Sequence, residues 1–278
     1  MRGTFRAALH NEFSKFARQK FPYIGMAAVV SLAVFWVRGI RQIASPAVEM
    51  TGFSLLLKGA VSAVTSIIPL FAVIFASVLV ASETDSGTYR NVLSRPIRRS
   101  TFLTTKIFFA FLYMVLLVAL YIVVAVPVIL SQYSFAPVTD NGEVIYSFGK
   151  IVGILAAAFL LTLVPLFAIV SYGILVSTAA RSLTSALGIG VGVLIAVEPI
   201  KHLVRWGNWN LSDYVLTSYL DTALNIADQA ASGFDYEWLP HGWLASDLSW
   251  GLMLSLAGIV VFLGASYTIF LRRDLNFS

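Results

Sequence analysis

Long runs without a charged residue dominate the sequence, and they decide what the chain can fold into. Six runs have about the length of a membrane-spanning helix. They cover residues 21–37, 59–82, 107–130, 151–180, 182–197 and 248–271. A helix needs ~20 apolar residues, each rising 1.5 Å, to cross the hydrocarbon core of a bilayer. We therefore expect six transmembrane helices, with Glu198 marking the outer boundary of the fifth.

The composition supports a membrane protein. Hydrophobic residues make up 58% of the 278 residues and charged residues 12%, whereas soluble domains have roughly 25% charged residues. A soluble fold of this size could not cover so much apolar surface. These numbers exclude a soluble enzyme and a conventional nucleic-acid binder. They predict an all-α integral membrane protein surrounded by membrane lipid, with no nucleic-acid partner.

The positions of the basic residues predict the orientation. If the N-terminus is cytoplasmic, most Lys and Arg residues fall in cytoplasmic segments, as the positive-inside rule requires. We expect both termini in the cytoplasm and one transmembrane domain over residues 1–278. Its parts are a cytoplasmic amphipathic segment at 1–20, a cytoplasmic loop at 82–106 and a structured outer loop at 198–247.

Residues 4–20 have apolar side chains at helical spacing among basic ones, which is typical of an amphipathic helix along the inner leaflet. An ordinary basic tail is the alternative. The outer loop repeats this spacing over 212–231, and most of the tryptophans lie in or near it. We expect short helices on or in the outer leaflet, the alternative being a water-exposed cap.

The fifth run contains Gly188 and Gly192, four residues apart. Small residues at this spacing let two helices approach closely in lipid. The sequence leaves open whether the neighbour belongs to a second subunit or to the same chain.

Motifs for catalysis are scarce. The chain has no cysteine, its three histidines are far apart, and no phosphate-binding loop or nucleophile elbow is present. The apolar cores of the runs hold no ionisable residue, which disfavours a proton-coupled carrier. We expect no catalytic residue, no metal and no cofactor in this chain. Any ATP hydrolysis belongs to another polypeptide.

The loop at 82–106 carries the strongest motif. Glu83 ends the second run, Asp85 or Ser86 can cap a short helix, and Pro96 ends that helix. Apolar Tyr89, Val92 and Leu93 would share one face, with arginines around them. Such a helix could dock a cytosolic partner; a loop whose arginines only fix the orientation is the alternative.

This loop resembles that of the permease subunits of ABC type-2 exporters. The shared pattern is a carboxylate, Gly-Thr, a short helix, Pro, basic residues and a Lys that opens the third span. The matching positions are Glu83, Gly87, Thr88, Val92, Leu93, Arg95, Pro96, Arg98, Arg99 and Lys106. The stretch from Asn11 to Lys20 is similar to the amphipathic elbow helix of the family.

The resemblance implies that two permease copies, identical or related, pair above two cytosolic ABC ATPase subunits that bind ATP and Mg. The segment from about Thr84 to Arg95 would be the coupling helix in a cell-membrane exporter. Its coupling residues would be Glu83, Asp85, Gly87, Thr88, Tyr89, Val92, Leu93, Arg95 and Pro96. A secondary transporter or channel, and a non-transporting scaffold or membrane enzyme, are the alternatives. The apolar runs suit a hydrophobic substrate but do not identify one.

Overall fold

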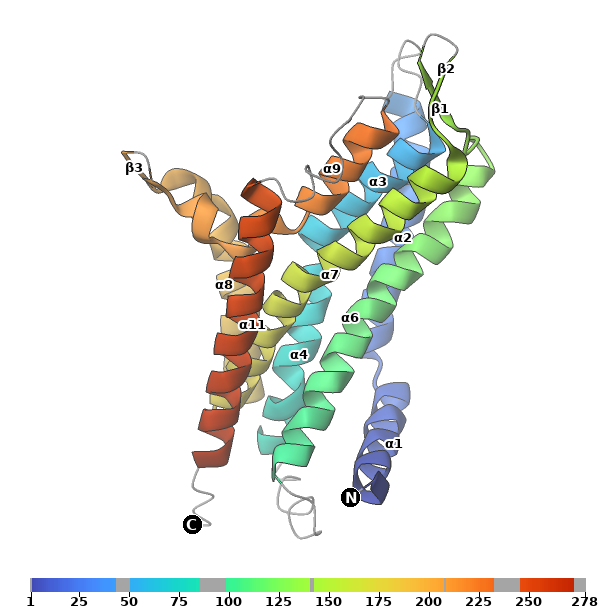
Figure 1. Ribbon diagram of the computed structural model, residues 1–278. Coiled ribbons are helices and arrows are strands. Elements are labelled where there is room, and N and C mark those ends of the chain that lie inside the picture. The colour runs from blue at the N-terminus through green and yellow to red at the C-terminus, as the bar shows by residue number, and fades with distance from the viewer. Residues whose placement is uncertain are drawn as a thin grey trace.

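Residues 2–43, 51–85, 99–140, 143–207, 209–232 and 246–272 are described by the computed structural model. Six helices are long and apolar enough to cross a membrane, which confirms the predicted all-α, six-span architecture (Figure 1). The longer helices are α1 (Arg2–Arg18), α2 (Phe21–Ile43), α3 (Gly52–Ser62), α4 (Ile68–Asp85), α6 (Arg99–Leu130), α7 (Phe148–Ala179), α8 (Leu183–Leu203) and α11 (Ser246–Arg272). The short α9 covers Thr222–Ala231.

Three spans extend beyond the uncharged runs by more than a turn of helix. The second begins at Gly52 and contains Lys58, and the third begins at Arg99, so Lys106 lies two turns inside α6 and does not open it. The fifth continues past Glu198 to Leu203. A lysine can lie inside a spanning helix when its long side chain reaches an interface or a partner. A prediction based only on uncharged residues therefore made these three helices too short.

A wide helical turn joins α3 and α4 into one span. Residues Ala63–Ile67 form a π-helix, and the Ile68 N–H donates to the Ala63 carbonyl five residues back. Pro69 follows directly; it has no N–H, and its ring crowds the carbonyl four residues earlier. The proline therefore accounts for the wider turn at this point.

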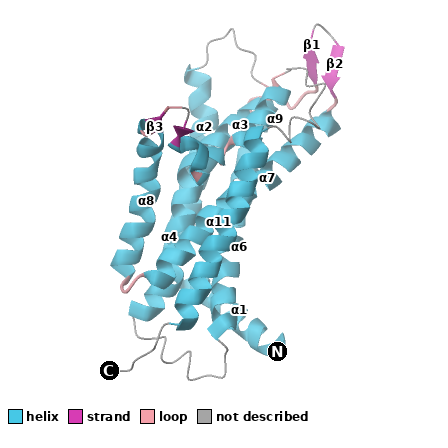
Figure 2. Cartoon of the chain, turned by 60° about the vertical axis from the view of Figure 1, so that its left-hand side comes forward, coloured by secondary structure: helices cyan, strands magenta, loops and turns pink. Residues whose placement is uncertain are grey.

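Helix α7 packs against α4 and α11. Helix α4 also contacts α8 and α6, and α2 lies along α6. Figure 1 shows α1 and the last turn of α11 at the same end of the bundle, which we call the termini end. The opposite end, here the far end, carries α9 and the antiparallel strands β1 (Val138–Asp140) and β2 (Glu143–Tyr146) (Figure 2).

Small residues allow α4, α7 and α8 to approach closely. A Cβ added at Gly190 would collide with Ser77, and one at Gly173 would lie 2.8 Å from the Ala76 side chain. The Ser177 hydroxyl of α7 donates to the Ser77 carbonyl at 2.7 Å. Close contact and interhelical hydrogen bonds replace the hydrophobic effect as the forces that hold helices together in lipid.

The segment predicted to be helical at 212–231 folds as two short 3₁₀ turns, Leu211–Tyr214 and Leu216–Tyr219, followed by α9. A two-residue strand pair, β3 (Arg205–Trp206) with β4 (Trp209–Asn210), precedes them. Helix α9 packs between α3 and α7, and Asp228 accepts a hydrogen bond of 2.6 Å from the Ser54 hydroxyl. It is therefore part of the helical bundle and does not rest on its surface.

Candidate functional site: a buried charge cluster

Four charged side chains meet at the termini end, where α1, α4 and α6 come together. Glu12 and Lys15 lie on α1, Glu83 lies in the last turn of α4, and Lys106 lies two turns inside α6. We call these four residues the charge cluster. Two carboxylates and two ammonium groups leave it with no net charge.

Lys106 is the centre of the charge cluster. Its Nζ lies 2.6 Å from Glu83 Oε1 and 2.9 Å from Glu12 Oε2. Lys15 closes the network from the other side, because its Nζ also contacts Glu83 Oε1 and lies 3.5 Å from Glu12 Oε1. Each carboxylate is thus shared by two lysines, and α1 is bonded to both α4 and α6.

The cluster is shielded from solvent. The Lys106 side chain is 2% exposed and the Glu83 side chain 7%, whereas Lys15 is 37% exposed. Removing charges from water is expensive, and a buried pair persists only where the opposite charge and further hydrogen bonds compensate for that cost. The two-to-two balance of charges provides this compensation.

Aromatic rings form the wall beside the cluster. Phe16 of α1 contacts Phe75 of α4 and Tyr113 of α6 edge-on, with ring centroids 5.8 and 5.9 Å apart. Glu12 and Phe16 are one helical turn apart, so the same face of α1 presents a charge and a ring to the bundle. The Lys106 ammonium also lies 5.2 Å from the centre of the Phe102 ring.

The environment shifts the pKa of Lys15, which lies outside the spanning segments. Burial lowers its pKa, but the hydrogen bond and the negative charge of Glu83 raise it, and Glu12 adds to this effect. The net result is a pKa above the ordinary value of 10.5. Lys15 is therefore charged at any physiological pH, as the network requires.

One acceptor of the cluster is unused. Glu83 Oε2 is buried and has no hydrogen-bond partner among the residues that the structure describes. A cavity of about 330 Å³ lies beside it, lined by Lys15, Gln19 and Ser82 among others. A buried carboxylate oxygen without a donor is costly, so this side of Glu83 is suited to receive one more donor.

Of the nine predicted coupling residues, the structure describes only Glu83 and Asp85. Glu83 is part of the cluster, and Asp85 is exposed in the last turn of α4. The remaining seven lie outside the described residues, and so does the predicted coupling helix. They are Gly87, Thr88, Tyr89, Val92, Leu93, Arg95 and Pro96. Their role stays a prediction.

Sequence reasoning missed Glu12 and Lys15 as members of a site, although both lie in the stretch that resembles an elbow helix. Their spacing of three residues on an otherwise apolar helix face was the available signal. A second ion pair at the far end was also missed. The nearly buried Lys201 lies 2.8 Å from Glu198 and 3.3 Å from the Thr217 hydroxyl.

Gly188 and Gly192 face away from the rest of the chain. A Cβ added at either glycine would meet nothing within 4 Å among the residues described, whereas Gly190, between them, packs against Ser77. The described part of the chain therefore provides no neighbour for Gly188 and Gly192. Contact with a second subunit at these two positions stays a prediction.

Comparison with known protein families gives a match over the first part of the chain. The chain is similar to the family model described as ABC-2 family transporter protein over residues 8–174. This range begins within α1 and ends within α7, and it contains all four residues of the charge cluster. No curated protein matches the chain.

Proposed function

The chain belongs to the ABC-2 family of transporter proteins, and we propose that it is the permease half of an exporter driven by a separate ATPase. The family match covers more than half of the chain, and members of this family are membrane subunits that are normally not enzymes. In the proposed complex two permeases pair and two cytosolic ATPase subunits bind ATP and Mg. The substrate stays unassigned.

The observation that carries the proposal is the position of the charge cluster relative to the loop. Helix α4 ends at Asp85, two residues after Glu83, and α6 begins at Arg99, seven residues before Lys106. The proposed docking segment joins these two helices. Any force applied to the loop therefore reaches α4 and α6 next to the pair that holds them together.

The chemistry of the cluster suits a mechanical role. Breaking one partner out of a buried ion pair costs about 3–5 kcal/mol, so α1, α4 and α6 resist separation and shift as one unit. ATP can drive such a shift only by favouring one arrangement of the helices over another. Glu83 Oε2, which has no hydrogen-bond partner among the described residues, offers a further acceptor for a donor from the loop or from the ATPase.

The proposed location is the cell membrane, with the termini end in the cytoplasm. The basic residues of the sequence support this orientation. Figure 1 places α1, the last turn of α11 and the first turn of α6 at this one end of the bundle. An ATPase that binds the segment between α4 and α6 would then meet ATP in the cytosol.

The proposal is tested by capturing the ATPase subunit together with the chain. The full chain is purified from its native membranes in mild detergent, and the retained proteins are identified by mass spectrometry. We expect a cytosolic protein with a phosphate-binding loop in roughly equal amount. The double substitution Val92→Asp with Leu93→Asp should abolish its retention while the chain still inserts into the membrane.

Val144→Asp is the matched control, since Val144 is an exposed apolar residue of β2 at the far end. It should retain the ATPase like the unmodified chain. If the double variant retains as much ATPase as the unmodified chain, the loop is not the docking site. If no ATPase is retained even after crosslinking through residues 83–106, ATP coupling is wrong, and transport should then be tested with an ion gradient in ATP-depleted vesicles.

A further inference from the structure

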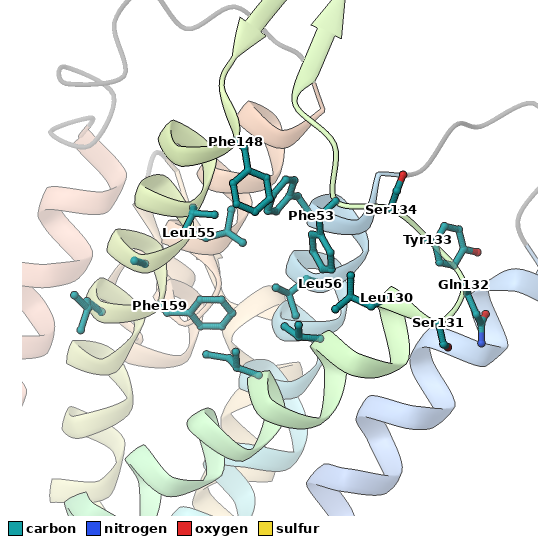
Figure 3. A pocket seen from close by; sticks show the side chains of 16 residues that line it. Phe53, Leu56, Leu130, Ser131, Gln132, Tyr133, Ser134, Phe148, Leu155 and Phe159 are labelled. Carbon is teal, nitrogen blue, oxygen red and sulfur yellow. The ribbon is translucent and has the colours of Figure 1, made fainter.

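A large apolar groove opens among α3, α6 and α7 at the far end (Figure 3). Its volume of about 1190 Å³ exceeds the ~300–1,000 Å³ of ordinary small-molecule pockets. Nearly all of its lining is hydrocarbon, and no residue that lines it is charged. A charged ligand would therefore find no partner inside it.

The walls of the groove run lengthwise along two helices. Ile122, Val126 and Leu130 follow one another at four-residue intervals on α6, and the wall on α7 extends from Phe148 to Leu160. At 1.5 Å per residue these walls are about 12 and 18 Å long. Half of a ~30 Å hydrocarbon core is about 15 Å. The groove thus has the length of the acyl region of one leaflet.

Polar residues gather at the far end of the groove. Ser131, Gln132, Tyr133 and Ser134 directly follow the last residue of α6 and line the groove there. Tyrosine at such a position is typical of a membrane interface, where its ring is half apolar and its hydroxyl meets water. The groove is thus apolar along its length and polar at its far end. A membrane lipid has the same order, with apolar acyl chains followed by a polar headgroup.

Local contacts hold the groove open without a ligand. The Phe53 ring of α3 contacts Phe135 and Phe148, with centroids 4.9 and 5.6 Å apart. The Gly52 N–H donates to the Ser134 carbonyl at 3.2 Å, and a Cβ at Gly52 would lie 3.0 Å from that oxygen. Glycine allows this approach, which fixes the polar rim to α3. A preformed site avoids the cost of ordering it when a ligand binds.

The groove also opens sideways. Leu130, Val152 and Leu160 on its edges are 59%, 43% and 66% exposed. These exposed side chains leave the groove open along the side of the membrane-spanning bundle. A molecule can therefore enter from the bilayer without crossing water.

We propose that this groove binds the acyl chains of one glycerophospholipid from the leaflet at the far end, with the headgroup beside residues 131–134. The length and the uncharged apolar lining match the acyl chains, and the hydroxyl and amide groups of the rim can donate to the ester and phosphate oxygens. Between lipid and protein the hydrophobic effect contributes little, so binding depends on close contact with the rigid rings of Phe53, Phe148 and Phe159. This inference does not depend on the proposed ATP coupling.

Ala156→Trp is the substitution that tests it. Ala156 lines the groove and is exposed, so an indole there fills the groove without entering the core of the bundle. Ala257→Trp is the matched control, because Ala257 is an exposed alanine of α11, away from the groove. Thermal unfolding of both variants establishes that they are folded.

The full chain is reconstituted in phosphatidylethanolamine and phosphatidylglycerol vesicles that contain a trace of phosphatidylcholine with a photoactivatable acyl chain. After illumination, peptide mass spectrometry locates the crosslinks. We expect them to concentrate on residues 122–135 and 148–160. Ala156→Trp should lose more than half of this labelling, whereas Ala257→Trp should keep it.

Two results would overturn the proposal. Labelling spread evenly over exposed apolar residues, including Val260 of α11, which is 72% exposed, would mean ordinary boundary lipid only. The second contradicting result would come from a photoreactive side chain placed at Val152. If it captures another copy of the chain or a different protein in place of lipid, the groove is a protein interface.

Discussion

The Lys106 ammonium group lies 2.6 Å from the Glu83 carboxylate, with both side chains almost wholly enclosed by the protein. The two residues come from α6 and α4, which are joined by the segment that we propose as the ATPase docking site. A short buried pair of this kind is stable only as a pair. Its strength, and that of the contacts around it, can be measured directly.

Replacing Lys106 by Met should destabilise the protein by about 3–5 kcal/mol, because Glu12 and Glu83 would be left buried with Lys15 as their only described cation. Adding Glu83→Gln should recover part of this loss. Denaturant unfolding of both single variants and the double variant measures the coupling. Lys20→Met, at an exposed position, should change stability by no more than about 0.5 kcal/mol. Strictly additive effects of the two cluster substitutions would contradict the pairing.

Alkaline pH should release α1 from the bundle. The pKa of Lys15 is raised above its ordinary value of 10.5, so its stabilising effect is complete below pH 10.5 and is lost as the pH rises through the raised pKa. A fluorescent label on a single cysteine at the exposed Phe13 would report the docking of α1. Lys15→Arg should shift the release to higher pH, because guanidinium keeps its charge. Release between pH 7 and 9 in the unmodified chain would be inconsistent with this role.

Substitutions at the glycines of α8 should distinguish helix packing within one chain from packing between two chains. Gly190→Val should cost about 1–3 kcal/mol, since the added side chain enters the contact with Ser77. Gly188→Ile with Gly192→Ile should leave the stability of the single chain within about 0.5 kcal/mol but weaken assembly of the permease pair. Native mass spectrometry measures the assembly. An unchanged dimer would rule out an interface at these two glycines.

Ser177 should contribute more to stability than other buried serines of α7. Its hydroxyl accepts from the backbone N–H groups of Val80 and Ala81, both at 3.0 Å, and donates to the Ser77 carbonyl. Ser177→Ala should cost about 0.5–1.5 kcal/mol, the net contribution of a typical hydrogen bond, since it removes the polar contact between α7 and α4. Ser171→Ala is the control, because the Ser171 hydroxyl donates to the Phe167 carbonyl of its own helix. Equal thermal unfolding of the two variants would show that the contact between helices contributes nothing.

The number of spans could be predicted because lipid excludes unpaired charges, so each uncharged run marks a helix. The ends of the helices could not, since Lys58 and Lys106 lie inside spans, and for Lys106 the compensating partners come from other helices. The β1–β2 hairpin was also missed. Asn141-Gly142, a strong hairpin signal, stands between its strands in the sequence.

The candidate site was predictable in part. Resemblance to a family pointed to Glu83 and Lys106 separately, but their contact with Glu12 is a tertiary relationship that no periodic pattern encodes. Their sequence separation of 94 places Glu12 and Lys106 in different helices. Only the three-residue spacing of Glu12 and Lys15 on α1 hinted that this helix carries a polar contact.

The same separation has a consequence for biogenesis. Glu12 leaves the ribosome early, while its partner on α6, Lys106, is made 94 residues later, which takes about 5–20 s at ordinary rates of synthesis. During this interval the α6 side of the α1 binding site is missing, although α4 already provides Glu83. The charge cluster can close only once α6 has been made, so complete docking of α1 reports that the first three of the six spans are in place.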